Sequence, residues 1–151
     1  MNAAECLRLL EERRLTLALA ESLTGGLLAD TFVRMPGASR VFRGGVVAYE
    51  DTVKRDVLGV PEKVLREQTA VSAMAALHMA RGARKLLGAD IALSTTGYAG
   101  PGGSDPGLFY TALCADGGET VREYRMRGTR GVIRKTAAAA AVSLLYTYLK
   151  G

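Results

Sequence analysis

Ser22 is a residue whose surroundings suit a chemical role. It lies in the segment Ala-Glu-Ser-Leu-Thr-Gly-Gly at 20–26, between the apolar run 15–20 and a helix-like pattern over 25–34. The first turn of a helix presents free backbone N–H groups and the positive end of the helix dipole. A serine hydroxyl placed there could attack an acyl carbon, and the N–H groups of residues 24–26 could stabilise the resulting oxyanion.

A serine hydroxyl needs a base within hydrogen-bond reach before it becomes a useful nucleophile. His78 is the only histidine, and it lies in the middle of a predicted helix between Met74 and Met79. A structural or surface role is favoured for it, so lysine is the remaining candidate base. The competing interpretation of Ser22 is a helix N-cap, a role that serine fills well.

Lys54 is the lysine that we favour as the base. It follows the predicted strand 41–49 and lies in the first turn of the next helix if Asp51 is the N-cap. Burial and the positive helix end would lower the pKa of its amine from about 10.4 towards the range of about 7–8 that suits a base. Tyr49 could relay the proton between Ser22 and Lys54. The alternatives are an ordinary exposed lysine and a tyrosine that fills the core.

A glycine-rich stretch, Thr-Thr-Gly-Tyr-Ala-Gly-Pro-Gly-Gly at 95–103, favours ligand binding. Its glycines let the backbone approach a ligand closely or form an anion-binding nest. We expect it to begin where the strand 90–94 ends, and open α/β sheets bind ligands at such carboxyl ends. It matches neither the P-loop nor the dinucleotide-binding pattern, so a long tight connection is the competing interpretation.

The net charge of +5 comes largely from basic residues near the last predicted helix, namely Arg122, Arg125, Arg127, Arg130, Arg134 and Lys135. No nucleic-acid-binding motif accompanies them, so nucleic acid is not favoured as a partner. Arg130 and Arg134 lie one turn apart on one helical face, which makes them the better candidates for binding the phosphate of a small ligand. A solvated basic face is the competing interpretation.

The scaffold that must position these residues is predicted to alternate helices and strands. Helices are expected over 2–13, 25–34, 51–58, 71–87 and 129–149, with a short one that has Pro61 at its first helical position; strands are expected over 15–20, 41–49, 90–94, 108–115 and 120–126. The last two strands flank Asp-Gly-Gly and predict a hairpin. The pattern predicts an α/β fold, a three-layer α/β/α sandwich with a mixed central sheet. Residues 1–151 are the size of a single domain.

Composition narrows the class of protein further. Hydrophobic residues make up 48% of the chain, which is enough for a packed core. No apolar run approaches the roughly 20 residues that span a bilayer, and the first residues lack the pattern of a signal peptide. Cys6 and Cys114 have no metal spacing, nor does any Asp, His or Glu cluster. We expect a cytoplasmic protein with no membrane contact, no metal and no cofactor; its oligomeric state, a homo-oligomer included, stays open.

Taken in order, these motifs resemble the CinA C-terminal domain family over nearly the whole chain. The resemblance is carried by 20–26, Pro-Gly-Ala-Ser at 36–39 with Phe42, Tyr49 with Lys54, Leu-Gly-Val at 58–60, Ala-Val-Ser at 70–72, Gly-Ala-Asp at 88–90 and 96–103. The ordered set is far more specific than any one of its segments.

Active members of that family are nicotinamide-nucleotide amidases. The resemblance therefore implies hydrolysis of nicotinamide mononucleotide to nicotinate mononucleotide and ammonia. It makes Ser22 the nucleophile, Lys54 the base and Tyr49 their assisting partner. The residues that we expect to bind the substrate or its oxyanion are Thr24, Gly25, Gly26, Thr96, Gly97, Ala99, Gly100, Gly102, Arg130 and Arg134.

The chain departs from the family pattern in four places. Family members usually have Cys in place of Leu23, Asn in place of Asp51, a Pro-Val-Gly-Thr-Val type segment at 105–109, and Gly-Asp/Asn-Arg at 128–130. The last two departures bear on substrate contacts rather than on the chemistry. Two other functions stay open: a non-catalytic nucleotide-binding module and a competence- or damage-linked partner protein. Non-catalytic family members typically lack the residue that corresponds to Ser22 or Lys54, and this chain has both.

Overall fold

The structure, a computed structural model, describes residues 2–151. The strands in this part of the chain are β1 (Leu17–Glu21), β2 (Phe42–Val47), β3 (Ile91–Gly97), β4 (Leu108–Ala115) and β5 (Gly118–Arg125). They form one sheet in the order β2-β1-β3-β4-β5. β1 is parallel to both β2 and β3, whereas β4 is antiparallel to β3 and β5. The predicted mixed sheet is therefore confirmed.

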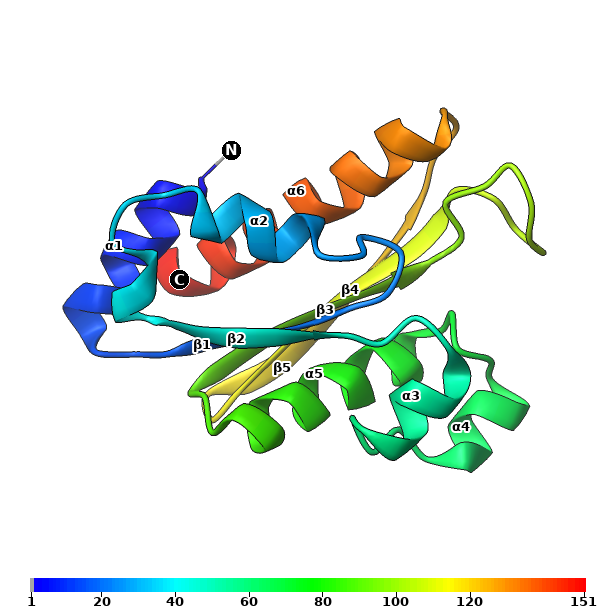
Figure 1. The fold of residues 1–151 in the computed structure, drawn as a ribbon, viewed down its shortest axis with the longest axis horizontal. Coiled ribbons are helices and arrows are strands. Elements are labelled where there is room, and N and C mark those ends of the chain that lie inside the picture. Colours follow the sequence, from blue (N-terminus) through cyan, green and yellow to red (C-terminus); the bar gives the residue numbers. More distant parts are fainter. Residues whose placement is uncertain (1) are drawn as a thin grey trace.

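Helices cover both faces of this sheet (Figure 1). On one face α1 (Ala3–Arg13), α2 (Leu27–Val33) and α6 (Arg130–Lys150) pack against one another, and the other face carries α3 (Asp51–Asp56), α4 (Glu62–Glu67) and α5 (Ala73–Leu87). A short 3-10 helix, η1 (Ala38–Arg40), leads into β2. The predicted three-layer α/β/α sandwich is confirmed.

β1 is the central element of the core, because helices cover it on both faces. Each of its residues is buried. Leu17 and Leu19 belong to the apolar cluster under α1, α2 and α6, whereas Ala18 and Ala20 belong to the cluster under α5. This alternation follows from the period of two in a strand. The carboxyl end of β1, with Ser22 directly after it, is therefore held in a fixed place.

The predicted elements are confirmed in type and order but differ at their ends. The predicted strand 90–94 continues to Gly97, because residues 95–97 pair with residues 109–111 of β4. The start of the glycine-rich stretch is thus strand rather than loop. The N-cap of α3 is Glu50 instead of Asp51, and Pro61 is the N-cap of α4 instead of its first helical residue.

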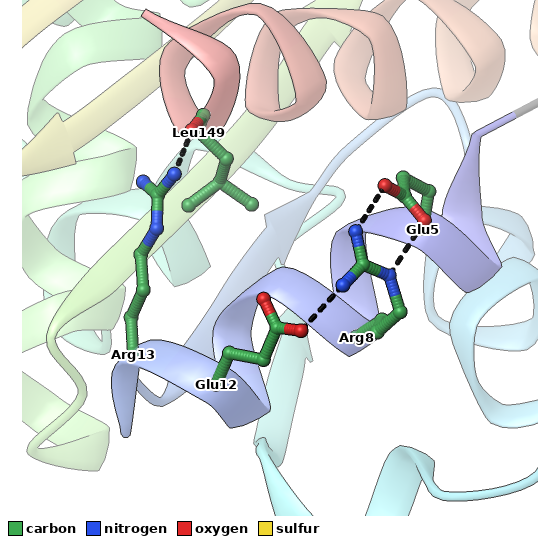
Figure 2. A network of polar contacts seen from close by, with 5 residues as sticks. All are labelled: Glu5, Arg8, Glu12, Arg13 and Leu149. Atoms are coloured by element: carbon green, nitrogen blue, oxygen red, sulfur yellow. Dashed lines mark hydrogen bonds and ion pairs between the residues drawn. The ribbon is translucent and has the colours of Figure 1, made fainter.

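α1 and the end of α6 are tied together away from the carboxyl ends of the parallel strands (Figure 2). Arg13, the last residue of α1, donates to the carbonyl of Leu149 in the last turn of α6. On the exposed side of α1, Arg8 pairs with Glu5 and Glu12. Exposed pairs of this kind contribute little to stability, because water and salt screen the charges. The Arg13 contact joins α1 to the end of the helix whose other end carries Arg130 and Arg134.

Candidate active site

The carboxyl ends of the parallel strands meet around a cavity of about 450 Å³. Ser22 follows β1, Tyr49 follows β2 and Gly97 ends β3, and each of them lines this cavity. Lys54 reaches it from α3. The fold therefore brings the predicted nucleophile, base and partner to one place. The other lining residues are Asp51, Leu65, Thr69, Ala70, Val71 and Tyr98.

Residues 21–26, which we call the Ser22 turn, are anchored to β3. Ser22 is 5% exposed, and its N–H donates to the carbonyl of Thr95 at 3.0 Å. The hydroxyls of Thr24 and Thr95 are hydrogen-bonded at 2.8 Å. The N-cap of α2 is Gly26, and no side chain caps that helix from the N-cap position. The interpretation of Ser22 as the N-cap is therefore wrong.

The carboxylate of Glu21 binds the N–H groups at the start of α2, where we expected the donors for an oxyanion. This carboxylate is 1% exposed and accepts the N–H groups of Gly26, Leu28 and Ala29 at 2.9–3.1 Å. A negative charge at a helix N-terminus is favourable because the peptide dipoles point towards it. Sequence reasoning did not assign Glu21 this role, although a carboxylate at the end of a buried strand signals a need for buried partners.

The engagement of these N–H groups changes the predicted oxyanion donors. The N–H of Gly25 donates to the carbonyl of Ser22 at 3.1 Å, and the N–H of Gly26 donates to Glu21. The N–H groups of Leu23 and Thr24, by contrast, donate to no other residue in the described part of the chain. Beside Ser22, the N–H groups without an acceptor in the described part of the chain are therefore those of residues 23 and 24, both of which are buried, rather than those of residues 25 and 26.

Lys54 is a buried lysine with one acidic neighbour in the cavity. It is 3% exposed, and no carboxylate among residues 2–151 forms an ion pair with it. Burial lowers the pKa of its amine from the usual 10.5, and the nearby charge of Asp51 partly opposes this change. The exposed-lysine alternative is wrong, and burial lowers the pKa as expected. The predicted place in the first turn of the helix is wrong, because Lys54 lies in the last turn of α3, away from the positive helix end. Within the described residues no hydrogen bond joins Lys54 to Ser22.

Tyr49 lies at the cavity rim rather than in the core. Its side chain is 60% exposed, and its hydroxyl accepts a hydrogen bond from Arg130 at 3.1 Å. The core-filling alternative is therefore wrong. Its relay between Ser22 and Lys54 stays a prediction, because no hydrogen bond joins Tyr49 to either residue in the described part of the chain.

The end of β3 was expected to bind substrate, and its side chains serve mainly to hold the cavity wall. The hydroxyl of Thr96 is fully buried and donates to the carbonyl of Ala70 at 2.7 Å. Gly97 lines the cavity, and a Cβ there would come within 2.4 Å of the Cβ of Phe109. Glycine at 97 is therefore required by sheet packing, and the hydroxyl of Thr96 is engaged in holding the cavity wall at Ala70.

The glycine-rich loop, residues 98–107, extends beyond the end of the sheet (Figure 1). Ala99 is buried in the apolar cluster that includes Leu23. The carbonyl of Gly100 accepts a hydrogen bond from Arg130 at 2.9 Å. Gly102 is exposed and has open space around its Cα. Of these expected substrate-binding residues, Gly102 alone has both free space and an exposed backbone.

Arg130 and Arg134, predicted as equivalent phosphate ligands, have different contacts. Arg130 links Tyr49 to the glycine-rich loop and is exposed. Arg134 is half-buried, and its guanidinium donates to the carbonyls of Leu23 and Thr24 at 2.8 and 3.0 Å. Arg134 is thus a contact of the Ser22 turn, and only Arg130 keeps a place beside the loop expected to hold the nucleotide.

His78 is a helix residue outside the cavity lining. It is half-buried in α5, and burial together with the charge of Arg81 lowers the pKa of its imidazole. It is not among the residues that line the cavity around Ser22. The preference for a structural or surface histidine over a catalytic one agrees with this position.

Among residues 2–151 the structure contains no metal-binding cluster, no membrane-spanning helix and no disulfide. No group of three or more His, Cys, Asp or Glu side chains there could hold a metal ion. None of the helices in this range is long and apolar enough to cross a bilayer. Cys6 and Cys114 are buried free thiols, and burial raises the pKa of Cys6 to about 12.

Sequence relatives carry the same family name as the resemblance. A model of the CinA C-terminal domain matches residues 2–149. The chain is 45% identical over 148 residues to a CinA-like protein of Thermotoga maritima, and 48% identical over 142 residues to one of Geobacter sulfurreducens. These matches cover 95% and 91% of this chain but 36% and 34% of the relatives. The chain thus spans about a third of the length of the curated relatives it matches.

Solved structures share the fold. A competence-damaged protein (CinA) superfamily protein from Klebsiella pneumoniae superposes with a TM-score of 0.93 at 32% identity, covering 99% of both chains. The competence/damage inducible protein CihA from Agrobacterium tumefaciens superposes with a TM-score of 0.91 at 34% identity, covering 100% of this chain and 97% of that one. Sequence and fold agree, and the chain belongs to the CinA C-terminal domain family.

Proposed function

We propose that this chain is an amidase that hydrolyses nicotinamide mononucleotide to nicotinate mononucleotide and ammonia through an ester on Ser22. The observation that carries the proposal is the cavity shared by Ser22 and Lys54, in which the lysine is buried without an ion-pair partner among residues 2–151. Burial lowers the pKa of this amine, which increases the share of the neutral form that can accept a proton relative to an ordinary lysine.

In the first half of the reaction, the neutral amine of Lys54 accepts the hydroxyl proton of Ser22 while Oγ attacks the carboxamide carbon. The proton passes directly after a rotation of the serine side chain, or through the hydroxyl of Tyr49 at the cavity rim. Catalytic hydrogen bonds often tighten only in the substrate complex, so the lack of a direct bond between Ser22 and Lys54 is compatible with this step. The carbonyl oxygen becomes an oxyanion next to the N–H groups of Leu23 and Thr24.

In the second half, the oxyanion collapses and the C–N bond breaks. The ammonium of Lys54 returns its proton to the leaving nitrogen, which departs as ammonia. Water then attacks the nicotinoyl ester, with Lys54 accepting one of its protons and giving it back to Ser22 Oγ. The net reaction consumes one water, releases one ammonia and regenerates the amine and the hydroxyl.

The nucleotide part of the substrate would extend from the cavity towards the glycine-rich loop. The cavity volume of about 450 Å³ falls within the range of small-molecule sites. Arg130, beside the loop, is exposed and free of any ion pair among the described residues, so its guanidinium is available to a phosphate.

The direct test is ammonia release from nicotinamide mononucleotide by wild type and by Ser22→Ala. We expect the substitution to lower kcat by on the order of 10⁶, as removal of a nucleophile does in comparable hydrolytic units. Ser39→Ala, at an exposed serine in η1, is the matched control and should keep wild-type activity. A wild type that releases no ammonia would favour the non-catalytic or competence-linked alternatives. A Ser22→Ala variant that retains turnover would refute the nucleophile assignment.

A further inference from the structure

We propose that Arg134 is a positioning residue for the oxyanion site, because it orients and polarises the peptide groups that follow Ser22. The inference rests on the proposed function and deepens it: it assigns the alignment of the oxyanion donor to a side chain on the far element α6. It also replaces the role in phosphate binding that the sequence suggested for this arginine.

Arg134 reaches the Ser22 turn from the second turn of α6. Its Nε donates to the carbonyl of Leu23 at 2.8 Å and its Nη2 donates to the carbonyl of Thr24 at 3.0 Å. The two bonds leave from one planar guanidinium and end on two successive peptide groups. No carboxylate among residues 2–151 forms an ion pair with Arg134, so its charge acts chiefly on these carbonyls.

The geometry of the peptide bond converts these contacts into donor alignment. A trans peptide is planar, so its C=O and N–H point in opposite directions. The carbonyl of Leu23 shares its peptide with the N–H of Thr24. Because Arg134 binds that carbonyl, it turns the Thr24 N–H away from α6, and the N–H donates to no other residue in the described part of the chain.

The second contact holds the turn closed. The carbonyl of Thr24 shares its peptide with the N–H of Gly25, which donates to the carbonyl of Ser22 at 3.1 Å. Arg134 therefore fixes one peptide that carries a free donor and the next peptide that closes the turn. A cation on a carbonyl oxygen also withdraws electron density from the amide, which strengthens its N–H as a donor.

The surroundings leave Arg134 little freedom to move. A Cβ at Gly25 would lie 3.3 Å from its Nη2, so the guanidinium is packed directly against the turn. Leu23 belongs to a buried cluster with Ile133 and Ala137 of α6, on either side of Arg134 in the sequence. Helix and turn therefore form one packed unit, and a small displacement of either would misalign the donor.

The test is the kinetics of Arg134→Ala and Arg134→Lys with nicotinamide mononucleotide. A misplacement of about 1 Å at a reacting group can cost about 10²-fold in rate, so we expect kcat to fall by about that factor while KM changes little. Lysine keeps the charge but lacks the planar fork that binds two carbonyls, so Arg134→Lys should recover only part of kcat. Guanidinium ion added to Arg134→Ala should restore part of the lost rate.

Lys135→Ala is the matched control, since it removes the next cation on α6 at an exposed site. It should keep the wild-type kcat. A kcat of Arg134→Ala equal to that of wild type would overturn the inference. So would a loss confined to KM for the nucleotide and absent with the riboside, because that pattern belongs to a phosphate ligand.

An NMR measurement tests the role of Arg134 independently of enzyme activity. The amide proton of Thr24 should shift upfield in Arg134→Lys relative to wild type, because a polarising contact on its own peptide is weakened. This variant also serves if Arg134→Ala does not fold. An unchanged Thr24 amide resonance would contradict the inference. A wild type without amidase activity would instead count against the proposed function, so the two failures are distinguishable.

Discussion

The Ser22 turn and the glycine-rich loop, which reach the cavity through Ser22 and Tyr98, differ in how firmly they are held. In the Ser22 turn, Glu21, Ser22 and Thr24 are each at most 5% exposed, and their polar groups bond to β3, α2 and α6. In the glycine-rich loop, by contrast, residues 101–104 are exposed and lie outside the cavity lining. That loop is held from outside by single contacts such as the bond from Arg130 and the exposed pair of Arg125 with Asp105.

This difference separates two tasks. Groups that stabilise a transition state must be in place before the reaction, which requires a firmly held segment. Groups that bind the distal part of a ligand can lie on exposed loops, which tolerate adjustment. Changes in the Ser22 turn and its supports should therefore act on kcat and stability, whereas changes near the loop should act mainly on substrate affinity.

After the loss of the Ser22 nucleophile, the largest effect is expected at Lys54. Lys54→Met keeps an unbranched side chain but removes the amine, and should lower kcat by about 10²- to 10⁴-fold, the usual contribution of a general base. His78→Ala is the control and should leave kcat unchanged. The kcat/KM of wild type should rise with pH through the lowered pKa of the Lys54 amine. A histidine-type inflection near about 6.5, abolished by His78→Ala, would instead identify the imidazole as the base.

The same lysine predicts a pH-dependent stability that needs no substrate. Burial puts the pKa of the Lys54 amine in the folded protein below its usual 10.5. Between the lowered folded value and the unfolded value, the unfolded chain binds more protons, so the free energy of unfolding should rise with pH in that window. Urea unfolding across this range should show the rise in wild type and a smaller one in Lys54→Met. Equal slopes would mean that the amine is not desolvated.

The next largest effect is expected on the free energy of unfolding when Glu21 is replaced. Glu21→Ala would remove the acceptor of three N–H groups at the start of α2, and should lower the free energy of unfolding by about 3 kcal/mol. Asp30→Ala is the matched control, because this carboxylate lies on the same helix in an exposed pair with Arg34. It should cost no more than about 1 kcal/mol. Similar losses in both variants would remove the contrast between the Ser22 turn and exposed contacts.

Near the glycine-rich loop, we expect the phosphate group of the substrate to make a moderate contribution to kcat/KM. Nicotinamide riboside should be a poorer substrate than the nucleotide by about 10- to 100-fold in kcat/KM, equivalent to one or two charge-assisted hydrogen bonds. Arg130→Ala should shrink this ratio, and Arg134→Ala should lower both substrates alike. Steady-state kinetics with both compounds measure the ratio. Equal efficiency of wild type on the two substrates would show that the phosphate is not bound.

The smallest effect is expected at Asp51, which lines the cavity with Lys54. Its charge raises the pKa of the Lys54 amine against the effect of burial, so Asp51→Asn should lower that pKa further. The acid limb of the pH–rate profile should then move to lower pH. Asp56→Asn, on the same helix and exposed in a pair with Arg55, should leave the profile in place. A shift to higher pH in Asp51→Asn would contradict the electrostatic explanation.

Much of the architecture could be predicted from local patterns. Apolar periodicity and turn residues indicated the order and type of the helices and strands, and the hairpin made the sheet mixed. The convergence of Ser22, Tyr49 and Lys54 followed too, because each lies just after a parallel strand or in the next helix. The extension of β3 to Gly97 did not follow, since glycine and threonine join a strand there only through pairing with β4.

The partners of polar side chains were the least predictable feature. Arg130 and Arg134 look equivalent in the sequence, yet one bonds to Tyr49 and Gly100 and the other to the Ser22 turn. The sequence shows Glu21 as part of a motif, and only the fold shows that its carboxylate accepts N–H groups of α2. These contacts join residues from different elements, and no local pattern encodes which donor meets which acceptor.

Local sequence is enough to specify the chemical groups and the strand ends at which they lie, because hydrophobic periodicity and turn chemistry act over a few neighbouring residues. Three properties depend on the folded arrangement: which N–H groups near Ser22 lack an acceptor, how far Lys54 is buried and which arginine supports the Ser22 turn. Those properties depend on packing between segments far apart in the chain, where desolvation and hydrogen-bond geometry are set by all the surrounding elements together.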